Sequence, residues 1–277
     1  MELGIFSRTY QPVGIDKIFA QVAQDGFQTI QFNFSSAGLP SLPKDWPEAT
    51  IKSVMASATR SGLTICALSG TYNMAHPDVA RRHADRIGFT NVVRAAQLMQ
   101  VPLVTLCTGS RNATDMWSAH PDNGSPEAWL ALRGELDFAL ELAERHGVAL
   151  GVEPEAGNVV GNAKSARRLL DEIENPRLKI VMDAANLLPP ECQTRQREVV
   201  AEAVSLLGAD IALVHTKDVS PTGEAVAAGR GVVDFHNFLQ GILSTSYRGP
   251  LVSHNFPEKD AAYVSGFLRR VLEEVMS

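Results

Sequence analysis

The chain alternates short, almost continuously apolar runs with longer segments in which apolar residues recur every three or four positions. The short runs lack the polar–apolar alternation of a strand with one solvated face. They therefore predict parallel strands that are covered on both faces. The predicted strands are 3–6, 29–34, 64–68, 103–107, 149–153, 179–183, 211–215 and 250–254.

The segments between these runs have the period of amphipathic helices. Residues 77–100 and 125–147 are the longest examples, and in the second Ser125 is the expected N-cap and Gly147 the expected end. No long linker or low-complexity stretch interrupts the series. We therefore predict an α/β fold in which residues 1–277 form a single (β/α)8 TIM barrel domain, with its site at the C-terminal rim of the strands.

Composition narrows the range of partners and compartments. The net charge of −6 argues against nucleic acid or an anionic membrane surface as the main partner. Cys66, Cys107 and Cys192 form neither a disulfide framework nor a CxxC metal motif, which favours a reducing compartment. The opening MELGIFSRTY lacks the basic start and apolar core of a signal peptide, and no apolar stretch is long enough to span a bilayer. We expect a cytoplasmic protein.

Four consecutive predicted strands, the fifth to the eighth, end in side chains that bind metals. These are Glu153, Asp183, His215 and His254. Each alone could cap a helix or join an ion pair, but the ends of parallel barrel strands converge on one rim. Mixed carboxylate and imidazole ligands suit Mn²⁺, Zn²⁺, Co²⁺ or Fe²⁺ better than Ca²⁺. A divalent ion would also supply the charge that lets acids end an apolar strand.

The motifs around these positions resemble the sugar phosphate isomerase/epimerase superfamily, the xylose-isomerase-like TIM barrels. The matching stretches are GVEPEAGNVV (151–160), VMDAANLL (181–188), VHTKD (214–218) and GRGVVDF (229–235). The superfamily includes ketose 3-epimerases, hydroxypyruvate isomerases, inosose isomerases and dehydratases, and the endonuclease IV branch. The resemblance implies one divalent ion (Mn, Co, Zn or Mg), held by Glu153, Asp183 and His215.

The sequence departs from the family pattern at two positions. His254 stands where the eighth strand usually supplies glutamate, and Asn186 stands where many members have histidine. In the ketose epimerases the two glutamates also exchange the proton at the inverted carbon, so the first substitution argues against a symmetric two-glutamate mechanism. We expect Glu153 to be base and ligand, and His254 to be the second acid/base or the fourth ligand. Glu258 could instead reach back from the following loop.

Other polar and aromatic residues fall at or beyond strand ends. The candidate substrate contacts are Glu155, Asn186, Arg111, Lys217 and His120. Arg111 and His120 lie in the long loop 107–124, where arginine could hold a carboxylate or phosphate or could form a surface ion pair. Phe34, Tyr72 and Trp117 could form an apolar wall for a sugar or could pack in the core. Asp218 is expected to orient its neighbours rather than to touch a metal.

These features predict a divalent-metal-dependent isomerase or epimerase that acts through an enediolate on a small ketose, aldose or related polyhydroxy carbonyl compound. A dehydratase of the same fold would use the same enolate and then expel a hydroxyl group. A catalytically degenerate sugar-binding barrel is a non-enzymatic alternative. A nuclease of the endonuclease IV kind would need many more histidines at strand ends. The expected partner is a small sugar, with no nucleic acid or membrane, and the resemblance leaves a homo-oligomer open.

Overall fold

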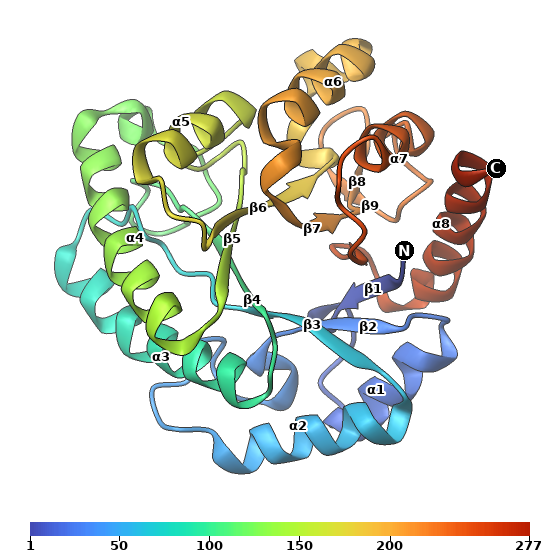
Figure 1. Ribbon diagram of the computed structural model, residues 1–277, viewed down its shortest axis with the longest axis horizontal. Helices are drawn as coiled ribbons and strands as arrows, with labels where there is room; N and C mark the ends of the chain where they lie inside the picture. Colours follow the sequence, from blue (N-terminus) through green and yellow to red (C-terminus); the bar gives the residue numbers. More distant parts are fainter.

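The computed structural model describes residues 1–277 and contains a closed barrel of eight parallel strands, which confirms the predicted fold class. Around the barrel the strand order is β1-β10-β7-β6-β5-β4-β3-β2, so each barrel strand pairs with the barrel strands that precede and follow it in the chain, and the last pairs with the first (Figure 1). The barrel strands are β1 (Leu3–Phe6), β2 (Thr29–Phe32), β3 (Thr64–Ser69), β4 (Leu103–Cys107), β5 (Ala149–Glu153), β6 (Leu178–Asp183), β7 (Ile211–His215) and β10 (Leu251–Ser253).

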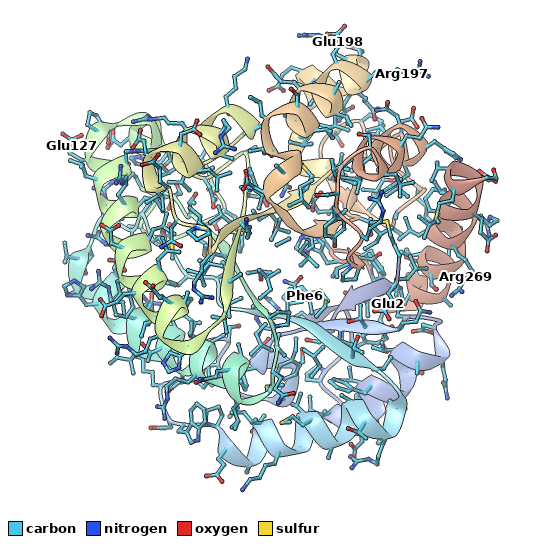
Figure 2. The ribbon with its side chains drawn as sticks, in the orientation of Figure 1. Glu2, Phe6, Glu127, Arg197, Glu198 and Arg269 are labelled. Atoms are coloured by element: carbon cyan, nitrogen blue, oxygen red, sulfur yellow. The ribbon has the colours of Figure 1, made fainter.

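A ring of helices surrounds the strands, and the last helix returns the C-terminus to the side of the barrel that holds β1 (Figure 1). The helices are α1 (Ile15–Gln24), α2 (Glu48–Ser61), α3 (Val79–Leu98), α4 (Pro126–His146), α5 (Ala163–Ile173), α6 (Gln196–Leu207), α7 (Phe235–Leu243) and α8 (Ala261–Met276). Charged side chains such as Glu127 and Arg269 lie on the outer surface (Figure 2). None of these helices combines the length and the apolarity needed to cross a membrane.

Helix α4 begins and ends where its sequence predicts. The Ser125 hydroxyl accepts a hydrogen bond from the Ala128 amide, which satisfies one of the free donors of the first turn. Gly147 ends the helix with φ of 70°, a left-handed conformation that glycine adopts without strain. The adjoining loop then leads directly into β5.

A layer of apolar side chains lies beneath the rim of the barrel. Val181, Leu213 and Val252 each come two residues before Asp183, His215 and His254, so they share their strand faces and lie deeper in the barrel. Gly151 occupies the same level on β5, where an added Cβ would lie 2.9 Å from the side chain of Val181. The layer therefore supports the polar side chains above it and prevents water from reaching them through the interior of the barrel.

Two local features differ from the prediction. Strand β2 ends at Phe32 rather than at residue 34, because the Asn33 side chain accepts from the Ser35 amide and turns the chain into the short helix η2 (Phe34–Ala37). After β7 the chain forms a small antiparallel ribbon of β8 (Asp218–Val219) and β9 (Ala225–Val226). Strands of two residues carry no periodicity from which to predict them.

Candidate functional site

The structure brings the four strand-end side chains together at the C-terminal rim. Glu153, Asp183 and His215 are the last residues of β5, β6 and β7, and His254 follows β10 directly. All four are buried, with 2 to 7% of their surface exposed. One potential ligand atom from each lies within 4.8 Å of those of the other three. Buried ionisable groups at this spacing need either mutual pairing or a bound ion.

A hydrogen bond from across the barrel orients His215. Its Nε2 lies 2.7 Å from Oε1 of Gln31 on β2, and the Gln31 amide nitrogen donates to the Thr105 hydroxyl. Because the amide oxygen can only accept, Nε2 of His215 carries a proton. When the ring is neutral, its Nδ1 therefore has a free lone pair. That Nδ1 is buried and makes no hydrogen bond, at 3.2 Å from Glu153 Oε2 and 4.0 Å from Asp183 Oδ2.

Asp183 lies at the base of the cluster. Its Oδ1 accepts from the Ala185 amide at 2.8 Å, and its Oδ2 lies 3.0 Å from Nε2 of His254. Burial would raise the pKa of Asp183, but the charge of Lys217 and the hydrogen bond with His254 hold it well below its usual value. Burial, together with the nearby His215 ring, lowers the pKa of His254. Asp183 is therefore an anion, and His254 is a neutral ring that can serve as a ligand.

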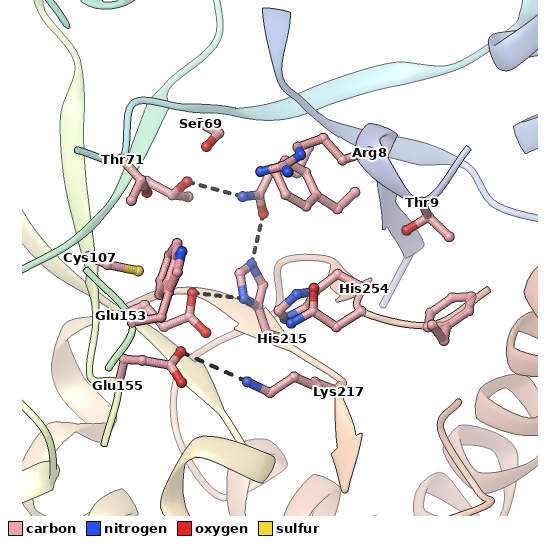
Figure 3. A pocket seen from close by; sticks show the side chains of 16 residues that line it. Arg8, Thr9, Ser69, Thr71, Cys107, Glu153, Glu155, His215, Lys217 and His254 are labelled. Atoms are coloured by element: carbon pink, nitrogen blue, oxygen red, sulfur yellow. Dashed lines mark hydrogen bonds and ion pairs between the residues drawn. The ribbon is translucent and has the colours of Figure 1, made fainter. Parts of the chain in front are cut away.

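Asn186 links two carboxylates to a buried lysine. Its side-chain nitrogen donates to Glu153 Oε1 and to Glu155 Oε2, each at 2.8 Å, and its oxygen accepts from Lys217 Nζ. Lys217 Nζ also lies 3.8 Å from Glu155 Oε2 (Figure 3). Burial raises the pKa of Glu155 to about 7, with Lys217 opposing the shift and Glu153 adding to it. Each acid at the end of this apolar strand thus has a defined partner.

Asp218 holds the loop that follows β7, as expected. Its carboxylate accepts from the amides of Val219, Gly229, Gly231 and Val233 at 2.8 to 3.1 Å. An added Cβ at Gly231 would lie 2.3 Å from Asp218 Oδ1, so this approach requires glycine. Asp218 therefore fixes the backbone next to Lys217 and does not join the four-residue cluster.

The loop after β5 is hydrogen-bonded to the long loop after β4 and packs closely against it. Asn158 accepts from the Gly109 amide at 2.7 Å and donates to the Met116 carbonyl at 2.9 Å. A Cβ at Gly157 would lie 1.9 Å from the carbonyl oxygen of Trp117, so the two backbones touch. This contact places the Trp117 side chain at the wall of the pocket.

A pocket of about 430 Å³ opens above the cluster and is lined mainly by polar side chains (Figure 3). Of the expected site residues, Glu153, Glu155, His215, Lys217 and His254 line it. Asp183 and Asn186 do not line it, but Asn186 is hydrogen-bonded to both glutamates. Phe34 and Tyr72 are buried in the core, so Trp117 alone of the three proposed aromatic residues reaches the pocket.

Three expected residues lie away from this pocket. Arg111 donates to the Ala75 carbonyl at 3.2 Å, and His120 accepts from the Asp122 amide at 3.2 Å as an N-cap. Glu258 accepts from the Gln11 amide at 3.0 Å and does not reach the cluster. A role for Arg111 or His120 in substrate binding stays a prediction.

The pocket also includes residues that sequence reasoning missed, chiefly Gln31 and Arg8. Gln31 is a long polar side chain between the apolar Ile30 and Phe32 of a buried strand, and this was the available signal. Arg8 lies two residues after the first strand, as Glu155 and Lys217 lie two residues after theirs.

The donor set fits a divalent ion. Asp183 and Glu153 supply carboxylate oxygens, and His215 directs toward both an Nδ1 that makes no hydrogen bond and is a free ligand atom when the ring is neutral. The second nitrogen of His215 is held by Gln31, the arrangement typical of metal-binding histidines. The fold and the cluster thus define a (β/α)8 barrel with a buried carboxylate–imidazole group that is able to hold a metal ion.

The chain belongs to the xylose isomerase-like TIM barrel family, which it matches over residues 19–271. This confirms the resemblance seen in the strand-end motifs. No curated protein matches the chain in sequence.

Several solved structures share the fold. The 3-keto-D-glucoside 4-epimerase YcjR from E. coli has a TM-score of 0.77 and 18% identity, with 98% of this chain and 99% of that chain covered. A D-psicose 3-epimerase from Clostridium cellulolyticum H10, solved with D-tagatose, has a TM-score of 0.75, 16% identity and coverage of 98% and 99%. A mannonate dehydratase from Streptococcus suis serotype 2 has a TM-score of 0.74, 14% identity and coverage of 100% and 93%. At such identities the likeness shows the fold alone.

Proposed function

We propose that this protein is a divalent-metal-dependent sugar isomerase or epimerase acting on a small ketose, aldose or related polyhydroxy carbonyl compound. The observation that carries the proposal is the unpaired Nδ1 of His215, buried beside Glu153 and Asp183 at the floor of a polar pocket. The epimerase activities named for two structural neighbours support the same reaction class.

Glu153, Asp183, His215 and His254 would hold the ion. When bound, it would act as a Lewis acid on a substrate carbonyl, which lowers the pKa of the adjacent C–H and favours an enediolate. Glu153 is the proposed base because its carboxylate lines the pocket and accepts only one hydrogen bond, from Asn186. Asn186 holds Oε1 in place and so fixes the direction of Oε2.

A second group would return the proton, and His254 is in place to do so. His254 lines the pocket, and imidazole titrates closest to neutral pH. It would serve as second acid/base or as fourth ligand, and in the latter role it would use a ring nitrogen that carries no proton. Glu155 would accept hydrogen bonds from substrate hydroxyl groups, and Lys217 would donate hydrogen bonds to them, on the side of the pocket that these two residues line.

Metal content is the direct test, with the purified wild type compared with Glu153→Ala and His254→Ala. We expect about one divalent ion per chain after reconstitution with Mn²⁺, Co²⁺ or Zn²⁺, and loss of the ion in Glu153→Ala. Solvent deuterium entering a panel of ketoses then tests for the enediolate. Wild type that binds none of these ions would contradict the proposal. If His254→Ala keeps the ion but loses exchange, His254 is an acid/base.

A dehydratase is the second candidate, supported by the mannonate dehydratase among the structural neighbours. It would form the same enolate and then lose a hydroxyl group, so identification of the product separates the two. A degenerate barrel would bind sugar without deuterium exchange. The single-domain organisation, the cytoplasmic location, the lack of nucleic-acid and membrane partners, and the oligomeric state stay predictions.

A further inference from the structure

Arg8 lines the pocket without a partner in the protein. It follows β1 by two residues, within the short helix η1 (Ser7–Thr9), and its side chain makes no hydrogen bond or ion pair. The neighbouring Ser7 is fully buried and accepts from the Asn33 amide at 3.0 Å and the Ser36 hydroxyl at 2.8 Å. The backbone that carries Arg8 is therefore fixed, while its guanidinium remains available for a ligand.

Two further unpartnered groups lie on the same side of the pocket. The Thr9 hydroxyl is buried and makes no hydrogen bond. Asn255, which follows His254, has φ of 60°, and its side chain also bonds to nothing in the protein. Strands β1 and β10 pair directly, and the Phe6 and His254 rings meet edge to face at 6.4 Å between centroids. The loops that follow these strands therefore present a guanidinium, a hydroxyl and an amide to one end of the pocket.

The opposite end of the pocket is already paired. There Glu155 and Lys217 lie 3.8 Å apart and share Asn186. Figure 3 shows Arg8 and Thr9 on the side of the pocket away from this pair. The charges of Glu153 and Asp183 would balance a divalent ion held by the cluster, with both histidines neutral. Arg8 is then the one charge of the pocket without a counter-charge.

We propose that the substrate carries an oxyanion, a carboxylate or a phosphate, and that Arg8 binds it together with Thr9. This deepens the proposed function, on which it rests, because it names the substrate class as an acidic sugar rather than a neutral one. Arginine presents parallel N–H donors that match both oxyanions. The reacting carbons would then face Glu153, at the centre of the pocket.

Binding to three sugars tests this: D-fructose, D-fructose 6-phosphate and D-glucuronate, measured by calorimetry on Mn²⁺-reconstituted protein. We expect wild type to bind one of the anionic sugars at least about tenfold more tightly than D-fructose. Arg8→Gln should lose about tenfold or more of that affinity with D-fructose binding unchanged, and Arg8→Lys should lose less. The tighter anionic sugar identifies phosphate or carboxylate as the group recognised.

The control is Arg197→Gln, which removes an exposed and equally unpaired arginine from the outer face of α6 (Figure 2). It should bind all three sugars as wild type does. Equal wild-type affinity for anionic and neutral sugars, no binding of either anionic sugar, or unchanged binding in Arg8→Gln would each overturn the proposal. Metal content and deuterium exchange are measured on the same samples. Their failure alongside an Arg8-dependent anion preference would contradict the proposed catalysis and leave the anion site intact.

Discussion

The amide oxygen of Gln31 lies 2.7 Å from Nε2 of His215, although the two residues are 184 positions apart in the chain. They meet because β2 and β7 belong to one closed barrel and their side chains point into its mouth. The contact places the imidazole proton on Nε2 and leaves Nδ1 free to face the two carboxylates. A strand residue with no ligand atom of its own at the cluster thereby determines what the cluster can bind.

Replacing Gln31 with leucine should weaken metal binding about 10- to 100-fold, since that is the usual effect of losing a partner that orients a metal-binding histidine. Without the amide oxygen, His215 is free to place its proton on Nδ1, toward the carboxylates. Competition with a chelator measures the affinity. Gln24→Leu, on the exposed face of α1, is the control and should bind metal normally. Unchanged affinity in a folded Gln31→Leu variant would show that the hydrogen bond does not orient the ring.

Glu153→Gln tests the role of base separately from the fold. Glutamine has the same shape and can still bond to Asn186, but it cannot accept a proton from carbon. We expect exchange of substrate hydrogen with solvent deuterium to fall about 100-fold or more. Glu127→Gln changes a surface acid at the start of α4 and should have no effect (Figure 2). A Glu153→Gln variant that binds metal and retains full turnover would exclude Glu153 as the base.

Gly157→Ala should displace the loop that carries Trp117. The added Cβ would lie 1.9 Å from the Trp117 carbonyl oxygen, and neither backbone can yield without moving its loop. We expect lower sugar affinity and a shift in tryptophan fluorescence. Gly134→Ala provides the contrast, because a Cβ there meets nothing within 4 Å. That substitution lies within α4 and should stabilise the protein by about 0.5–1 kcal/mol. If Gly157→Ala has wild-type tryptophan fluorescence and sugar affinity, the contact between Gly157 and the Trp117 backbone does not position the loop.

Glu135 should make the free energy of unfolding depend on pH. Its buried carboxylate accepts from Tyr72 at 3.0 Å, from Arg82 at 3.1 Å and from Arg86 at 2.9 and 3.0 Å. Burial alone would raise the pKa of Glu135, but the bonds from Arg86, Tyr72 and Arg82 hold it below its usual value of 4.5. The folded protein thus binds this proton less readily than the unfolded chain does. The stabilisation is complete above the unfolded pKa and is lost as the pH falls through the folded one.

Urea unfolding between pH 3 and pH 7, with Glu135→Gln as the variant, measures this contribution. At neutral pH we expect the variant to lose about 3 kcal/mol, because two arginines lose their buried counter-charge. Its free energy of unfolding should also fall less steeply with acid than that of wild type. Glu141→Gln, which breaks an exposed pair with Arg145, should change stability by less than about 0.5 kcal/mol. Parallel acid dependence in wild type and Glu135→Gln would exclude the proposed role.

The strands and the four residues at their ends could be predicted from the sequence, because both depend on local order. An apolar run bounded by helical patterns becomes a parallel strand wherever it lies in the barrel, and the last residue of such a strand reaches the rim. The cap at Ser125 and the end at Gly147 are likewise properties of a few neighbouring residues. Glu153, Asp183, His215 and His254 therefore met as predicted.

The partners of those residues were decided by the tertiary structure alone. Gln31 reaches His215 across the barrel, Asn186 lies between two glutamates, and Arg8 remains unpaired while Arg111 finds the Ala75 carbonyl. Each outcome depends on which side chains of distant loops come within about 3 Å of one another, the range of a hydrogen bond. Spacing along the chain holds no information on such distances. The sequence determined which groups would reach the rim, and barrel closure and loop packing determined which remain free for a ligand.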